Sequence, residues 1–261
     1  MSTFESRKRS REVNEKLIKF ALIGAAVISI LTTFGILFSI LFEAIEFFKL
    51  RSFWYFITGA TWSPGVIGSK FGALPIFAGT FVITIIALGV AIPVGLGSAI
   101  YMSEYASANI RDYLKPLLEI LAGIPTVVYG FFAAITVAPL VVQIAEFFGL
   151  EATFNSALAS GVVMGIMIIP VISSLSDDVI RAVPDSQRKA AFALGMTHGE
   201  TIKNIVLPSA MPGIISASLL GLSKALGETM IVVMAAGLRP NLSWNPLEDM
   251  TTVTVTIVNS L

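Results

Sequence analysis

The chain has 261 residues, of which 55% are hydrophobic and only 13% are charged, and its mean hydropathy is +0.85. Soluble domains carry charge on about a quarter of their residues, so this composition excludes an ordinary soluble domain and indicates a membrane protein. Lys plus Arg and Asp plus Glu number 17 each, which gives zero formal net charge. Because the chain has no cysteine, disulfides and thiolate chemistry are excluded.

Five stretches without Lys, Arg, Asp or Glu are each long enough to cross a bilayer as a helix, which takes roughly 20 apolar residues. Their side chains are continuously apolar rather than alternating, which favours helices over the strands of a barrel. We therefore predict an all-α membrane protein with a basic N-terminal segment over residues 1–19 and a membrane domain over residues 20–261. The five uncharged runs are 20–42, 71–103, 120–145, 152–176 and 204–223.

The distribution of basic residues predicts the orientation of these spans. With the N-terminus in the cytoplasm, most of the 17 basic residues fall on the cytoplasmic side, as the positive-inside rule requires. An odd number of spans leaves the C-terminus outside, and residues 251–261 are too short and too rich in hydroxyls to cross. We expect that a sixth helix has been lost by truncation; a complete five-helix protein is the alternative. The basic residues on the cytoplasmic side are Arg7, Lys8, Arg9, Arg11, Lys16, Lys19, Arg111, Lys115, Arg181, Arg188, Lys189 and Lys203.

Proline and glycine interrupt several of the spans, which favours a bundle with movable parts over an inert anchor. Small residues also allow close helix packing, and Ala157, Gly161 and Gly165 recur every four residues along one helix face. The prolines within the spans are Pro93, Pro125, Pro139 and Pro170.

A polar island, residues 177–208, separates the fourth and fifth uncharged runs. Within it, residues 187–194 are expected to form a short helix that Gly195 ends in the left-handed conformation. A second short helix over about 200–206 then leads to Pro208, which suits the first turn of the next span. The predicted product is a helical elbow that inserts apolar side chains into a groove on a partner. These side chains are Ala190, Ala191, Phe192 and Leu194.

The island resembles the cytoplasmic loop of the integral membrane subunits of ABC importers, which reads Glu-Ala-Ala, three residues, Gly, nine residues, Ile-x-Leu-Pro. Lys189 stands where that family usually has Glu. The resemblance implies a type I, MetI-like helix bundle in which loop 177–208 couples the permease to a dimer of ATPase subunits. An ordinary amphipathic elbow at the membrane surface is the alternative. The matching positions are Ala190, Ala191, Gly195, Ile205, Leu207 and Pro208.

Residues 124–130 and 224–230 resemble, more narrowly, the phosphate-specific permeases of the PstC type. This resemblance implies import of inorganic phosphate across the cell inner membrane, with a homologous A-type permease and an extracytoplasmic phosphate-binding protein as partners. The chain has no Gly-x-x-x-x-Gly-Lys-Ser/Thr loop, so ATP hydrolysis is expected in a partner subunit and this subunit is not expected to be an enzyme. We expect contact with membrane lipid, and neither a cofactor, a metal nor a nucleic acid.

Lys224 and Glu228 are the ionisable residues at the end of the last span, and on a continuous helix their spacing places them on one face. Because charges are costly inside a bilayer, such residues usually face a bundle interior or an aqueous path. We expect Lys224 to attract a passing oxyanion, while Glu228 holds or releases that cation; mutual neutralisation is the alternative. PstC-type permeases usually have Arg at position 224, and Lys keeps the charge without the planar fork. The hydroxyls of Ser223, Thr229 and Tyr129 are expected either to bind the anion or to satisfy nearby carbonyls.

Asp177 and Asp178 lie at the start of the polar island and have no third metal ligand near them in the sequence. We expect both on a solvated face. Two other functions stay open from the sequence: a permease for sulfate or another oxyanion, and an ion-coupled secondary transporter or channel. The second of these would need inverted repeats, and none is visible in the sequence.

Overall fold

The computed structural model describes residues 2–65 and 69–260, with side chains from residue 15 onward. Most side chains of the basic segment predicted over residues 1–19 therefore lie outside the description, although its backbone is described from residue 2. The chain divides into two compact units, Met1–Phe56 and Ile57–Leu261, which are described separately below.

The first unit is dominated by one long helix, α1 (Ser2–Leu50). Its apolar part, Glu15–Leu50, is 36 residues long and buries none of its most hydropathic window inside the protein. The helix runs without a break through the basic segment and the predicted span over 20–42. The physical reason is that no proline precedes Pro64, so nothing ends the helix among the Lys, Arg and Glu residues, which favour helix. Helix α2 (Phe53–Thr58) follows, and Phe53 lies edge-on to Phe48 of α1 at 5.1 Å.

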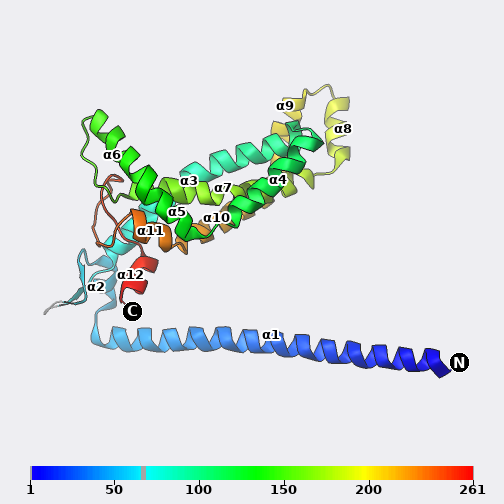
Figure 1. Ribbon diagram of the computed structural model, residues 1–261, viewed down its shortest axis with the longest axis horizontal. Helices are drawn as coiled ribbons and strands as arrows, with labels where there is room; N and C mark the ends of the chain where they lie inside the picture. The colour runs from blue at the N-terminus through cyan, green and yellow to red at the C-terminus, as the bar shows by residue number, and fades with distance from the viewer. Residues whose placement is uncertain (1, 66–68, 261) are drawn as a thin grey trace. The chain divides into compact units, whose positions relative to one another are not determined.

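The second unit is a helix bundle with a minimal antiparallel hairpin, β1 (Trp62–Ser63) and β2 (Lys70–Phe71), near its start. Figure 1 shows α8 and α9 at one end of this bundle, called here the elbow end, and α6 at the opposite end. Its helices and π-helical turns, in chain order, are α3 (Leu74–Ile100), η1 (Tyr101–Tyr105), α4 (Ala108–Ala122), α5 (Thr126–Phe132), η2 (Ala133–Val137), α6 (Ala138–Phe147), α7 (Ala157–Arg181), α8 (Asp185–Ala193), α9 (His198–Thr201), η3 (Ile202–Val206), α10 (Leu207–Leu226), α11 (Met230–Ala235) and α12 (Val253–Ser260).

Helix α7 is the centre of the bundle, and it packs against both α3 and α10. The approach to α3 depends on small residues, because a Cβ atom at Gly165 would lie 2.8 Å from the Ala87 carbonyl oxygen and 2.8 Å from the Val90 Cβ. At Gly161 a Cβ atom would lie 2.7 Å from the Ile86 side chain. Close helix packing, predicted from the four-residue spacing of these glycines, is confirmed. Inside a membrane such packing supplies the van der Waals contact that holds helices together.

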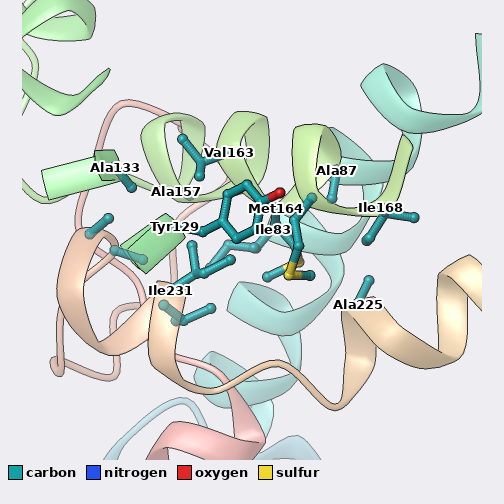
Figure 2. Close-up of a cluster of buried hydrophobic side chains, with 14 of the residues drawn as sticks. Ile83, Ala87, Tyr129, Ala133, Ala157, Val163, Met164, Ile168, Ala225 and Ile231 are labelled. Carbon is teal, nitrogen blue, oxygen red and sulfur yellow. The ribbon is translucent and has the colours of Figure 1, made fainter. Parts of the chain in front are cut away.

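The largest cluster of buried apolar side chains surrounds α7 (Figure 2). Val163, Met164 and Ile168 of α7 meet Ile83 of α3 and Ile231 of α11 there. A second cluster near the elbow end joins Ala99, Ile180, Val183, Val206, Ala210 and Ile214. The core therefore lies between helices, while many large apolar side chains remain on the outer faces, as expected for a protein solvated by lipid.

Five helices of the described chain are long and apolar enough to cross a membrane, which agrees with the five spans predicted from the sequence. The third is shorter than its uncharged run of 120–145, because α4 ends at Ala122 and a new helix starts only at Thr126. Helix α4 itself was missing from the prediction, since its charged residues lie outside the uncharged runs. The five spans are Glu15–Leu50, Leu74–Tyr105, Thr126–Phe147, Ala157–Arg181 and His198–Leu226.

Two π-helical turns lie directly before prolines. Turn η2 ends two residues before Pro139, and η3 ends two residues before Pro208. A proline has no N–H to donate and its ring clashes with the carbonyl four residues earlier. A π-helical turn widens the helix at that carbonyl, so both helices continue instead of breaking.

Candidate functional site

The elbow starts with helix α8, which ends in a Schellman motif, as expected from the sequence. The Gly195 N–H donates to the Phe192 carbonyl at 2.9 Å, and the Met196 N–H donates to the Ala191 carbonyl at 3.2 Å. Gly195 has a φ of +82°, which is the left-handed conformation that a glycine adopts without strain. The glycine thus turns the chain sharply and satisfies the last carbonyls of α8.

The second arm of the elbow is a capped helix that continues into the membrane. The Thr197 hydroxyl accepts from the Glu200 N–H, and the Glu200 carboxylate accepts from the Thr197 N–H at 2.8 Å, which is a capping box. We predicted a separate short helix over about 200–206, but the helix is continuous from His198 to Leu226. The π-helical turn η3 makes this possible, because it joins α9 to α10 without a break, while Pro208 lies in the first turn of α10 as predicted.

A groove of 540 Å³ lies between the two arms. Apolar atoms dominate its walls, and four of the residues predicted to couple to an ATPase line it. These four are Ala190, Ala191, Ile205 and Pro208. The structure therefore brings together residues from both halves of the Ala-Ala to Leu-Pro pattern on one surface.

The remaining elbow residues differ in exposure. Lys189, Ala190 and Gly195 are exposed, and Leu207 is half-buried. Ala191 is buried, so the prediction that it is exposed for insertion into a partner is wrong; its methyl group lies on the inner face of α8. Leu194, in contrast, is 84% exposed and is the most accessible apolar side chain of the elbow.

The acidic pair at the end of α7 also differs from the prediction of a solvated face. Asp177 is fully buried and accepts from Arg111 of α4 at 2.7 Å, while Asp178 pairs with Lys115 of the same helix. The hydrogen bond to Asp177 raises the pKa of Arg111 above its ordinary value, although burial opposes that change. The sequence contained a signal for this contact, because two cations spaced four residues apart on one helix face can meet two adjacent carboxylates.

Two helices of the bundle are broken inside it, and the broken ends lie close together. Between α4 and α5, Pro125 has the extended backbone that follows a helix end. The Tyr129 hydroxyl spans this break and donates to the Leu121 carbonyl at 2.9 Å, so it satisfies a carbonyl, which was one of its two expected roles. Beyond the break, a Cβ atom at Gly130 of α5 would lie 3.2 Å from the Met230 carbonyl oxygen at the start of α11.

The second break separates Lys224 from Glu228. Helix α10 ends at Leu226, so the two side chains do not share a helix face as we predicted. Gly227 ends the helix, and Glu228 turns back to accept from the N–H groups of Met230 and Ile231 at 3.0 and 3.3 Å. The carboxylate thus satisfies the first N–H groups of α11, where a negative charge is favoured.

Lys224 is half-buried at the end of α10 and has no carboxylate oxygen within 4 Å among the described residues. Thr229 is also half-buried, and Ser223 is exposed. Ala225, next to Lys224, points into the buried cluster (Figure 2), so Lys224 lies on a different side of the helix. The second break therefore has a cation, Lys224, and two hydroxyls, those of Ser223 and Thr229, that are accessible to a ligand or a partner.

Comparison with known proteins identifies the family. Residues 91–250 match the profile described as "Binding-protein-dependent transport system inner membrane component". A probable ABC transporter permease protein of Bacillus subtilis is 32% identical over 254 residues, which cover 97% of this chain and 81% of that protein. A phosphate transport system permease protein, PstC 1, of Mycobacterium bovis is 33% identical over 266 residues, covering 90% of this chain and 78% of the relative.

Among solved structures, the MetNI methionine ABC transporter in inward-facing conformations aligns with 64% of this chain and 74% of its own, with a TM-score of 0.47 and 21% identity. The family match covers the breaks, the central helix α7 and the whole elbow. This chain is therefore a multi-pass membrane protein that belongs to the permease subunits of binding-protein-dependent ABC transporters.

Proposed function

We propose that this chain is one of two homologous permease subunits of an importer that moves inorganic phosphate into the cytoplasm. Its relatives in Mycobacterium bovis, Mesorhizobium japonicum and Xylella fastidiosa carry the name of phosphate transport system permease proteins. The observation that carries the proposal is Lys224, a cation without a carboxylate partner among the described side chains, beside two broken helices. An oxyanion that loses water in the membrane needs such a charge close by.

The path for phosphate runs along the side of the breaks that carries Lys224 and Thr229, and the A-type permease subunit closes this path from the other side. Glu228 contributes by holding the start of α11 rather than by pairing with Lys224, because it accepts from two N–H groups of α11 and no carboxylate oxygen of the described residues lies within 4 Å of Lys224. Lys224 then keeps its positive potential for the anion. An extracytoplasmic phosphate-binding protein delivers the ligand at the end of the bundle opposite the elbow.

The elbow is the docking surface for the ATPase subunits that supply the energy. The elbow and the N-terminus then lie on the cytoplasmic side of the cell inner membrane. The groove between its arms and the exposed Leu194 give an apolar contact surface. Lys189 presents a positive charge there, so the facing part of the ATPase is expected to differ from that of a permease with Glu at this position. Coupling then depends on Lys189, Ala190, Ala191, Gly195, Ile205, Leu207 and Pro208.

Reconstitution tests both parts of the proposal. The permease pair, the ATPase subunits and the binding protein are placed in lipid vesicles, and uptake of radioactive phosphate is measured with and without ATP. We expect uptake that requires ATP and that excess sulfate does not inhibit. Inhibition by sulfate would show a permease for oxyanions in general, and uptake driven by an ion gradient without ATP would show a secondary transporter.

The docking surface is tested by Leu194→Asp, because this side chain is 84% exposed, so we expect the elbow to stay folded after its replacement. We expect loss of ATPase co-purification with the permease. Leu150→Asp, which changes an exposed leucine at the opposite end of the bundle, is the matched control and should co-purify as the wild type does. Equal co-purification of the ATPase with both variants would contradict the docking surface.

A further inference from the structure

One side chain of the elbow helix α8, Arg188, reaches the ends of two membrane helices. Its Nη1 donates to the Glu104 carboxylate in η1, which continues α3. Its Nη2 donates to the Ile180 carbonyl in the last turn of α7 at 2.9 Å. The guanidinium of Arg188 therefore connects the elbow to both helices that form the centre of the bundle.

Glu104 also faces the second arm of the elbow. Its Oε2 lies 3.9 Å from the Nε2 of His198, the first residue of α9. The His198 ring lies edge-on to Tyr105 at 5.2 Å and is stacked on Phe192 at 6.3 Å. The two oxygens of one carboxylate thus face both arms of the elbow.

The pair is shielded from solvent, which makes it strong and specific. The side chain of Glu104 is 5% exposed and that of Arg188 is 17% exposed. Charge-assisted hydrogen bonds are stronger than neutral ones, and removal of one partner leaves the other as an uncompensated charge. By comparison, Asp185 lies 3.9 Å from Arg188 on the outer surface and is 85% exposed, so it adds little.

We propose that the Arg188–Glu104 pair is the joint that transmits movement of the elbow to α3 and α7 during transport. This inference rests on the proposed function, because it assumes that an ATPase moves the elbow. A displacement of α8 changes the position of the guanidinium, and the two hydrogen bonds carry that change to the ends of α3 and α7. Arg188 and Glu104 are positioning residues, since neither lies beside the breaks where the anion passes.

The test measures ATP hydrolysed per phosphate imported by the complete importer in lipid vesicles. Arg188→Gln and Glu104→Gln should each raise this ratio by about 2- to 30-fold, the range of single residues that couple distant sites. The double variant should show the same ratio as Arg188→Gln, because removal of Arg188 already removes its bond to Glu104 together with its bond to the Ile180 carbonyl. Arg181→Gln, which removes an exposed cation in the last turn of α7, should keep the wild-type ratio.

Two further measurements on the same preparations, ATPase co-purification and thermal unfolding, distinguish a role of the Arg188–Glu104 pair in coupling from a role in stability alone. If the pair is the joint, the ATPase should still co-purify with each variant, but its ATP hydrolysis should no longer be coupled to phosphate import. A wild-type ratio of ATP hydrolysed to phosphate imported in both single variants would overturn the joint but not the docking surface. Failure of Leu194→Asp to weaken co-purification would refute the docking surface. Loss of assembly in both single variants would also overturn the joint, because the pair would then stabilise the fold alone.

Discussion

Lys224 and Glu228 show how an intervening glycine decides whether two charged residues share a helix face. Their spacing of four predicts a shared helix face, but Gly227 ends α10 between them and allows Glu228 to cap α11. Glu228 is 8% exposed and its carboxylate accepts from backbone N–H groups, so its burial does not require a hydrogen bond from Lys224. The two charges therefore have separate roles, one toward the anion and one toward the backbone.

This separation predicts different outcomes for two substitutions. Lys224→Met should lower the initial rate of phosphate uptake by about tenfold, equivalent to about 1.4 kcal/mol, while Lys224→Arg should restore most of it. Glu228→Gln keeps an oxygen that accepts from Met230 and Ile231, so uptake should stay within about twofold of the wild type.

Uptake measured at equal permease concentration in vesicles checks both expectations. A tenfold loss for Glu228→Gln as well would indicate that the two charges act as a pair, contrary to the separation described here. Unchanged uptake for Lys224→Met would remove this lysine from the phosphate path.

Helices and their contacts were partly predictable from the sequence. The five long uncharged runs predicted the five spans, because a bilayer imposes a minimum length on each helix. The small residues of α7 predicted its close contact with α3. Helix α4 was missed because its charged residues lie outside the uncharged runs, and the burial of Asp177 depends on a contact 66 positions apart, for which the spacing of Arg111 and Lys115 was the available signal. The break at Gly227 could not be predicted either, because glycine occurs both within and at the ends of membrane helices.

The contact between α3 and α7 predicts opposite effects of the same substitution at two glycines. In Gly165→Ala the new methyl group meets the Ala87 carbonyl and the Val90 side chain at 2.8 Å, so α3 and α7 have to separate. We expect a loss of about 1–3 kcal/mol in stability, as for other overpacked sites. Gly97→Ala finds no atom within 4 Å and should be neutral or stabilise α3 by up to about 1 kcal/mol.

Thermal unfolding of both variants in detergent is the measurement. A melting temperature for Gly165→Ala equal to that of Gly97→Ala would show that the two helices adapt to the methyl group without loss.

On the scale of the whole second unit, hydrogen bonds hold its two ends in different ways. At the elbow end, ion pairs connect α4 to α7 and α8 to η1. At the opposite end, the loop between α11 and α12 is held to the start of α7 by backbone hydrogen bonds, including Ala157 N–H to the Glu248 carbonyl at 3.1 Å. Salt weakens exposed ion pairs more than shielded ones, so we expect it to weaken Lys115–Asp178, whose carboxylate side chain is 53% exposed, more than the other two pairs or the backbone hydrogen bonds.

The loop opposite the elbow has its own pH dependence. Hydrogen bonds from Ser243, Asn241 and Asn245 lower the pKa of the Glu248 carboxyl below its ordinary value of 4.5. Because the folded state favours the charged form, the contribution of Glu248 to stability is complete above about pH 4.5 and is lost as the pH falls through the lowered pKa.

We therefore expect the difference in melting temperature between the wild type and Glu248→Gln to be constant above that pH and to shrink below it. Melting curves recorded from pH 7 to pH 3 give this difference directly. A difference that does not change with pH would show that the carboxylate charge has no part in holding the loop.

The position of α7, enclosed between α3 and α10, also bears on the order in which parts of the protein open. Its amides are covered by protein on most sides, and its small residues leave little room for rearrangement. At the breaks, residues 123–125 and 227–229, regular helical hydrogen bonding stops after the Gly123 N–H, which donates to the Glu119 carbonyl, and after the Gly227 N–H, which donates to the Ser223 carbonyl. In a transport cycle we therefore expect α7 to move as a rigid rod, with the hinges at the two breaks.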